Sequence, residues 1–222
     1  NETLNYQWQL DGANLLDGTQ DTNATVGDIG GKLTVTSDAG DNFEIDFEQL
    51  ASFDGFETDR TYTITSDGEV TTRVYAIGAG GGTSNVRSVR GGFGGAAQGI
   101  TTFYAGETYI LRVGGKGRNG GGGGRGGAGG FSGGGLGGGG HGLGGGGGGF
   151  TGLFKDSVTQ ANAIIIAGGA GGGSNDPATG GPGGGLEGST GSNGGRAGAG
   201  GTQTAGGRGS GGGDAGTALQ GG

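Results

Sequence analysis

Glycine is unevenly distributed along this chain, and that distribution constrains the fold more than any other feature. Of the 71 glycines, 8 lie in residues 1–77 and the other 63 lie in residues 78–222. Gly loses more backbone freedom on folding than any other residue, and ordering a backbone costs roughly 1–2 kcal/mol per residue. Because glycine tracts have no side chains to bury, ordered tracts need backbone hydrogen bonds between closely packed segments. The sequence therefore predicts a backbone-built scaffold rather than a catalyst.

Composition limits the size of any conventional core. Only 29% of the residues are hydrophobic, whereas apolar residues and glycine usually make up about 45–50%. There is no cysteine, which excludes disulfides and thiolate metal sites, and there is no apolar run of about 18 residues that would insert into a membrane. The chain begins at Asn1 without a signal-like segment, so we expect processing or truncation upstream.

Charge is segregated along the chain. The formal net charge is -8, but residues 1–77 carry 15 acidic and 3 basic residues, whereas residues 78–222 carry 5 acidic and 9 basic residues. Two interpretations are open. One is an acidic soluble region beside a weakly basic one. The other is a dipolar subunit whose opposite ends attract in a head-to-tail array.

The N-terminal region predicts short β-strands separated by turns. Residues 5–10 alternate in polarity and precede Asp11-Gly12, a strong turn signal. Residues 32–36 alternate again before a turn at residues 38–40, and a further face of period two follows at Phe43, Ile45 and Phe47. Strands at intervals of about ten residues favour a small sandwich.

This stretch resembles the Ig-like modules common in bacterial and phage surface proteins. The likeness rests on residues 6–9 with Asp11-Gly12, and on residues 31–36 before the Asp-Ala-Gly turn. In that family the Trp lies on the third strand and packs between the sheets. Trp8 comes too early for two strands to precede it, so the resemblance implies an incomplete module over residues 1–60. The residues expected to serve its packing and assembly are Tyr6, Trp8, Leu33 and Val35.

From residue 61 onward, strands alternate with glycine tracts. Residues 62–65, the turn Ser66-Asp67-Gly68 and residues 70–77 predict a hairpin that runs directly into a tract. Further strands are expected within residues 100–113, broken by a turn at 105–107, and at residues 150–154 and 163–167. These strands would anchor the tracts.

This order resembles the glycine-rich domain of many phage tail-fibre and bacterial surface proteins. The same domain type occurs in the extracellular region of the anaplastic lymphoma kinase and leukocyte tyrosine kinase receptors. The matching segments are residues 74–82, 105–117, 144–150 and 164–171. The resemblance implies an all-β fold in which residues 61–222 form a β-sandwich whose glycine-rich loops extend as packed polyglycine-II helices. Because the family includes fibres and receptors, it leaves the function open.

The chemistry of glycine leads to such helices independently. A left-handed helix with three residues per turn has no internal hydrogen bonds, so its polar groups must pair with neighbouring segments, which only Gly lets approach closely. Strict Gly-X-Y is absent and only two prolines are present, which excludes collagen. Arg125, Ala128 and Phe131 recur every three residues and are expected on one edge of a helix. We expect at least four such segments in residues 114–149 and 168–222.

No catalytic centre, metal or cofactor is expected. The Gly-x-Gly-x-x-Gly matches are uninformative because none precedes a helix-forming pattern, and Lys116 is followed by Gly117, so no phosphate-binding loop is present. His141 is the single histidine and has no polar partner nearby in the sequence. Four acidic residues suggest calcium, but EF-hand spacing is absent and turn chemistry explains their positions: Asp38, Asp41, Asp46 and Asp54.

Basic and apolar side chains within the tracts are candidates for contacts. The basic residues are either solvated charges on loop tips or contacts to a carbohydrate or anionic polymer; nucleic acid would need a denser patch with stacking aromatics. Those selected for surface recognition are Arg87, Arg90, Arg118 and Arg125, with Arg112 and Lys116 nearby. The apolar residues expected to pack on neighbouring glycine helices or another subunit are Phe131, Leu136, Leu143 and Phe150.

The sequence therefore predicts an extracellular, non-enzymatic structural subunit of a fibre or filament, such as a phage tail fibre, adhesin or cell-surface appendage. The expected partners are further copies of the chain, in a head-to-tail contact involving residues 1–50, and a cell-surface glycan or protein receptor, which the loop tips of the glycine helices would contact. Neither nucleic acid nor membrane insertion is expected. Two alternatives stay open: a monomeric ligand-recognition ectodomain, and an ice-binding protein. The second ranks last because Thr202, Thr204 and Ala205 are too few and irregular for an ice-binding row.

Overall fold

The computed structural model describes an all-β chain. The residues described are 32–46, 56–85, 88–121, 125–138, 143–174, 178–184, 187–192, 217 and 219, together with the backbone of residues 8–10 and 13–15. These residues contain ten strands and one single-turn 3₁₀ helix, η1 (Gln160–Asn162), but no α-helix. Within them, no helix has the length and apolar character needed to cross a membrane.

Six strands form one antiparallel sheet in the order β10-β9-β8-β5-β3-β4. Their bounds are β3 (Lys32–Ser37), β4 (Asn42–Asp46), β5 (Arg60–Ser66), β8 (Thr108–Val113), β9 (Thr151–Lys155) and β10 (Ala163–Ala167). Exposed and buried residues alternate strictly along β3, as its sequence predicts, so that Leu33 and Val35 face the core. β3 pairs with β5, so the position expected for a domain boundary, near residue 60, lies within one hydrogen-bonded sheet.

A two-stranded ribbon of β6 (Val70–Ile77) and β7 (Ala96–Phe103) packs against this sheet. The core lies between the two layers, because Val70 and Phe103 from the ribbon join one buried cluster with residues of the six-stranded sheet. Within this cluster the rings of Phe103 and Tyr109 meet edge to face, with centroids 4.6 Å apart. A separate pair, β1 (Trp8–Leu10) and β2 (Ala13–Leu15), places Leu10 opposite Ala13, which confirms a strand over the last three residues of the expected stretch 5–10; the expected turn at residues 11 and 12 lies outside the described residues.

The expected hairpin between residues 62–65 and 70–77 is wrong. β5 pairs with β3 and β8, whereas β6 pairs with β7 in the other layer. The turn between them is fixed to β3, because the Lys32 N–H donates to the Asp67 carboxylate at 2.8 Å. Val70 then begins β6 fully buried in the core. β5 and β6 each bury one apolar face. The chain buries both faces in the same core because it crosses to the opposite side of the core after β5 instead of returning beside it.

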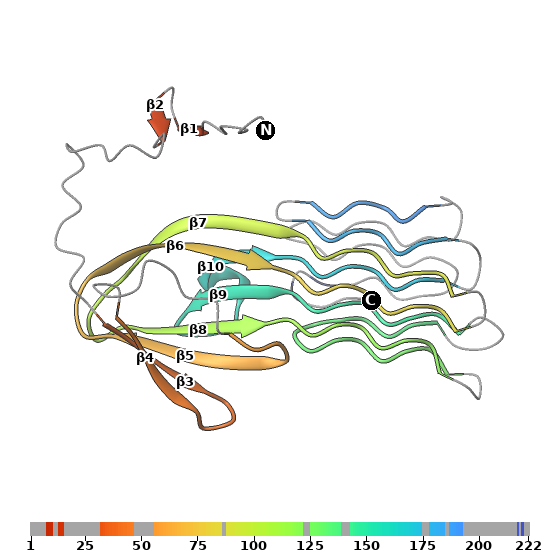
Figure 1. The fold of residues 1–222 in the computed structure, drawn as a ribbon, viewed down its shortest axis with the longest axis horizontal. Helices are drawn as coiled ribbons and strands as arrows, with labels where there is room; N and C mark the ends of the chain where they lie inside the picture. The colour runs from red at the N-terminus through yellow and green to blue at the C-terminus, as the bar shows by residue number, and fades with distance from the viewer. Residues whose placement is uncertain are drawn as a thin grey trace, which may run out of the picture.

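Beyond the strands, the glycine tracts form a packed array of extended segments, which we call the glycine slab. It comprises residues 78–85, 88–95, 114–121, 125–131, 132–138, 143–150, 168–174, 178–184 and 187–192. Figure 1 shows these segments as wavy traces that continue the strands side by side. Strands β6, β8 and β10 run into slab segments at their ends, and β7 and β9 begin where slab segments end. The core is therefore the anchor of the slab.

Hydrogen bonds within the slab repeat every three residues. In segment 143–150, six consecutive N–H groups donate in turn to three neighbouring segments, and residues three apart donate to the same neighbour. The bonds are Gly145 to Gly173 and Gly148 to Ala170; Gly146 to Arg118 and Gly149 to Gly115; and Gly147 to Gly135 and Phe150 to Ser132, all at 2.8–2.9 Å. The same segment accepts bonds from segments 78–85 and 125–131. It is thus surrounded by five neighbours.

Close approach, rather than an unusual backbone conformation, explains why these residues are glycine. Among the glycines described, only Gly40, Gly106 and Gly133 have positive φ. In contrast, a Cβ on Gly146 would lie 2.1 Å from the Ala128 carbonyl oxygen, and one on Gly117 would lie 2.0 Å from the Gly146 oxygen. Real Cβ atoms essentially never come within 3.0 Å of another heavy atom. The slab therefore excludes side chains on its inner positions.

Candidate recognition surface and cleft

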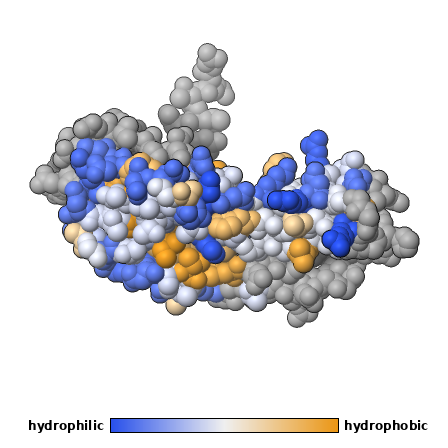
Figure 2. Space-filling model, turned by 90° about the horizontal axis from the view of Figure 1, so that it is seen from below, coloured by the Kyte–Doolittle hydropathy of each residue, from blue (hydrophilic) through white to orange (hydrophobic). Residues whose placement is uncertain are grey.

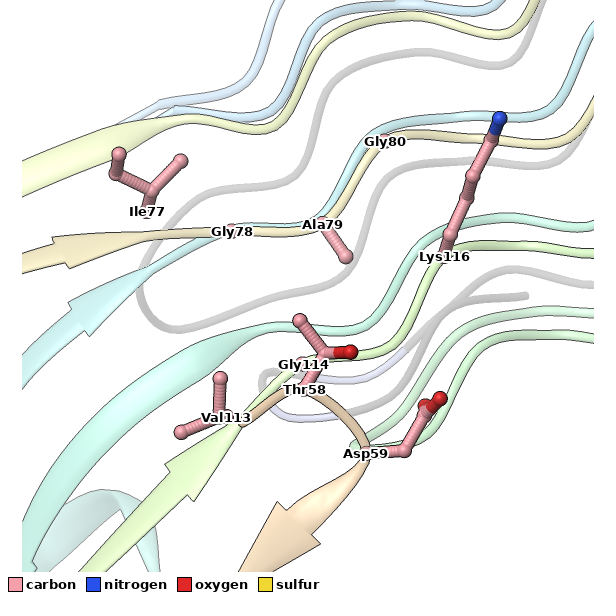
Figure 3. A pocket seen from close by; sticks show the side chains of 9 residues that line it. All are labelled: Thr58, Asp59, Ile77, Gly78, Ala79, Gly80, Val113, Gly114 and Lys116. Carbon is pink, nitrogen blue, oxygen red and sulfur yellow. The ribbon is translucent and has the colours of Figure 1, made fainter. Parts of the chain in front are cut away.

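A cleft lies where the strands enter the glycine slab. It has a volume of about 410 Å³, and it is lined by Thr58, Asp59, Ile77, Gly78, Ala79, Gly80, Val113, Gly114 and Lys116. Figure 3 shows Ile77 and Val113 on the side of the strands, with Asp59 and Lys116 toward the slab. The ends of β6 and β8 position one wall, and the loop before β5 supplies the other. The cleft thus combines apolar side chains with one carboxylate and one ammonium group.

The Asp59 side chain lies against the slab backbone at Gly115. Its φ is 60°, in the left-handed region that Asp adopts more readily than most residues. A Cβ on Gly115 would overlap the Asp59 carboxylate oxygen, so a glycine at position 115 lets this carboxylate lie against the backbone. Neither Asp59 nor Lys116 has an ion pair or side-chain hydrogen bond within the described part of the chain. Both charges are available to a ligand.

Four exposed basic residues lie on closely packed segments of the glycine slab, and one of them, Lys116, lines this cleft; we call the four residues the basic face. They are Arg90, Lys116, Arg118 and Arg125. Their segments are neighbours: Gly117 donates to Gly80 and Gly81 to Gly92, which orders segments 114–121, 78–85 and 88–95, and Arg118 donates to Ala128 on the far side. The structure therefore places three of the four arginines predicted for recognition on one series of adjacent segments, while Arg87 lies outside the described residues.

The charged residues of the slab are almost all basic. Among its described residues the acidic side chains amount to Glu187 alone, against the four residues of the basic face. None of these four cations has an ion pair with a described carboxylate. Arg112 is different, because its guanidinium lies over the Phe131 ring, 5.2 Å from the centroid. Arg112 therefore joins β8 to the slab instead of extending the basic face.

Exposed residues in the outer segments recur every three positions. Arg90, Phe93 and Ala96 are exposed, as are Lys116 and Asn119; Arg118, between the last two, is exposed as well and departs from this spacing. Arg125 and Ala128 are also exposed and Phe131 is half-buried, in agreement with the predicted edge. Figure 2 shows hydrophilic residues projecting from the pale glycine region. The surface is therefore flat backbone with side chains at regular intervals.

The apolar candidates occupy different environments. Phe150 is 7% exposed and packs on Phe154, with ring centroids 5.9 Å apart. Leu143 is half-buried, whereas Leu136 is 78% exposed. Backbone alone is described for Trp8, and Tyr6 and His141 lie outside the described residues. Leu33 and Val35 belong to the core and Phe150 packs at its margin, so Leu136 is the candidate left available for an intermolecular contact.

Apolar side chains are also exposed on the outer face of the β6–β7 ribbon. Tyr75, Ile77 and Ile100 are 62%, 58% and 64% exposed. Arg73 lies opposite Ile100 on the same face. These residues could not be singled out from the sequence, because alternation in β6 does not indicate which face is covered.

The acidic residues considered for calcium take part in local structure. Asp38 accepts the Thr61 N–H at 3.1 Å and lies 3.8 Å from Arg60, and Asp41 accepts the Ser37 hydroxyl at 3.1 Å. Asp54 lies outside the described residues. Among the residues described, no group of three or more His, Cys, Asp or Glu side chains is arranged to hold a metal. Turn chemistry thus accounts for Asp38 and Asp41.

A polar cluster that the sequence did not reveal joins β8 to β9. The buried Tyr109 hydroxyl donates to Glu107 at 2.7 Å, and Lys155 donates to the other Glu107 oxygen at 2.5 Å. The hydrogen bonds from Lys155 and Tyr109 lower the pKa of Glu107. Burial, and then the bond to Glu107, raises the pKa of Tyr109. The cluster lies on the six-stranded sheet and stabilises a junction between strands.

Comparison with known proteins gives no match for this chain among protein-family models, curated proteins or solved structures. Function is therefore argued from the slab, the cleft and the basic face.

Proposed function

We propose that this chain is an extracellular structural subunit of a fibre or filament on a virion or cell surface, with a non-enzymatic role. The observation that carries the proposal is the three-residue repeat of backbone hydrogen bonds across the glycine slab. A large part of the chain forms this array, which has few side chains, so the array sets the shape and the length of the molecule. Such an array suits a rod better than a solvent-excluding reaction site.

We infer that the slab segments are polyglycine-II helices. A helix of this type has three residues per turn and no internal hydrogen bonds, so residues three apart face the same neighbour. The alternation of partners along residues 145–150 follows this geometry. The prevalence of glycines without positive φ is compatible with a left-handed polyproline-type backbone.

Assembly is proposed to be head-to-tail through residues 1–50. β4 ends the six-stranded sheet, and β3 is its one partner among the described strands; we place the contact with a strand of another copy at the end of this sheet. β4 and the preceding turn carry Asp38, Asp41, Glu44 and Asp46, whereas the slab is basic. A heterologous contact between opposite ends makes an open filament when its rotation does not close.

The proposal is tested by sedimentation over a wide concentration range, with electron microscopy of the same samples. We expect concentration-dependent polymers that weaken as salt is added, because exposed charges are screened within about 10 Å at 0.1 M ionic strength. Glu44→Lys on β4 should weaken association more than Glu69→Lys, which makes the same charge change on an exposed residue outside β4. A monodisperse monomer at every concentration would contradict the fibre role and favour a monomeric recognition module.

A further inference from the structure

We propose that the basic face and the adjoining cleft bind an acidic polysaccharide, with one sugar acid seated in the cleft. This inference rests on the proposed function, since it names what a surface fibre of this kind would contact. It also places recognition on the side of the glycine slab, where the expectation from the sequence was the loop tips.

The first argument is the arrangement of unpaired cations. Arg90, Lys116, Arg118 and Arg125 extend over neighbouring segments of a rigid slab, and no described carboxylate neutralises them. Arg90 and Arg125 lie on two different segments, and Lys116 and Arg118 lie two residues apart on a third. Cations distributed over three segments match a polymer that carries an anion on each repeating unit better than they match a single small anion.

The second argument is the mixed chemistry of the cleft. Lys116 provides a cation for a sugar carboxylate, while Thr58 and the unpaired Asp59 carboxylate can accept hydrogen bonds from hydroxyl groups. Val113 offers apolar surface to the C–H face of a ring. A volume of about 410 Å³ is within the range of about 300–1,000 Å³ typical of ligand sites.

The Asp59 carboxylate also selects among polyanions. Asp59 repels the negative charge of a phosphodiester and that of a sugar carboxylate alike, but a phosphodiester group has no hydroxyl donor to offset this repulsion by a hydrogen bond to Asp59. A uronic acid presents both a carboxylate and several hydroxyl donors on one ring. The cleft thus favours an acidic sugar over a phosphodiester. The exposed aromatic ring of Phe93, beside Arg90 on the same segment, adds a surface on which a further sugar ring can lie.

The experiment measures binding of polygalacturonate, its fully methyl-esterified form, and double-stranded DNA to dilute protein by interferometry or calorimetry. The ester keeps the same backbone but has no charge. We expect polygalacturonate to bind, with affinity falling as salt is added, and the ester to bind at least tenfold more weakly. Lys116→Gln should reduce polygalacturonate affinity about tenfold, as expected for the loss of one charged hydrogen bond. Arg73→Gln is the matched control, because Arg73 is exposed on β6 and lies away from the slab.

Asp59→Asn separates an acidic-sugar site from a general polyanion surface. It should weaken polygalacturonate binding and strengthen DNA binding, because the repulsion of phosphate is removed while the best hydroxyl acceptor is lost. The inference is overturned if polygalacturonate fails to bind, if DNA binds as well as polygalacturonate to the unmodified chain, or if Lys116→Gln and Arg73→Gln behave alike. If Lys116→Gln weakens self-association and leaves glycan binding unchanged, the basic face is an interface between copies and the inference is again wrong. If the chain forms polymers but does not bind the glycan, the fibre role stands and the glycan inference is wrong. If the chain binds the glycan but forms no polymers, the fibre role is wrong and the glycan inference stands.

Discussion

Replacing Gly146 by alanine should destabilise the protein strongly, although alanine suits its backbone conformation. The added Cβ would lie 2.1 Å from the Ala128 carbonyl oxygen and 2.5 Å from its carbon, both backbone atoms that no side-chain rotation can move aside. Forced displacement of this kind costs about 1–3 kcal/mol. The same displacement would strain two backbone hydrogen bonds, from the Gly146 N–H to Arg118 and from the Gly82 N–H to Gly146. Each is 2.8 Å long and contributes about 0.5–1.5 kcal/mol.

A loss of about 4 kcal/mol in the free energy of unfolding is therefore expected from these contributions. For a chain of this size, it corresponds to a lowering of Tm by about 8–16 °C. Thermal unfolding followed by circular dichroism measures it. Gly138→Ala is the matched control, since a Cβ there meets nothing within 4 Å, and a compatible Gly-to-Ala change stabilises by about 0.4–1 kcal/mol through the unfolded state. Equal stability of the two variants would refute the argument that space, and not conformational freedom, requires glycine in the slab.

Three further predictions concern the sheet. Leu153→Ala should lower the free energy of unfolding by about 2–5 kcal/mol, measured by denaturant titration, because Leu153 is 2% exposed in the core. Tyr109→Phe should destabilise, since the Glu107 carboxylate and the Tyr104 N–H lose a hydroxyl partner; an unchanged denaturation midpoint would show that this hydroxyl contributes nothing. The lowered pKa of Glu107 adds stability above its ordinary value of 4.5, and this stability is lost as the pH falls through the lowered pKa. Glu107→Gln should therefore show a smaller drop in denaturation midpoint between pH 7 and pH 3 than the unmodified chain.

Local pattern predicted the strands well where each strand buries one face. The alternation of residues 32–36 placed Leu33 and Val35 inward, and the apolar runs at residues 150–154 and 163–167 correspond to β9 and β10. The local pattern did not predict which strands pair with one another. Ser66-Asp67-Gly68 predicts a tight turn, but a tight turn leads equally to a hairpin or to a crossing between layers. The difference depends on partners distant in sequence, since β3 and β8 occupy both edges of β5.

The candidate site divides in the same way. The sequence indicated Arg90, Arg118 and Arg125 as surface groups because a glycine tract cannot bury them, but it did not indicate which segments would pack beside one another. It also gave no reason to connect Asp59 with residues some fifty positions later. That connection arises because β5 pairs with β8, with Arg60 opposite Val113, which sets Asp59 against the start of segment 114–121.

The sequence by itself determined which interactions can stabilise this protein. Glycine at such density leaves backbone hydrogen bonds as the available source of stability, and the alternating strands between the tracts require a small β core that anchors them. The tertiary structure decided which segments are neighbours, because a glycine segment offers the same N–H and C=O groups in all directions and carries almost no local information about its partners. Those partners are selected by the strands, whose pairing order and direction fix where each tract enters the slab. The cleft and the basic face are consequences of that selection.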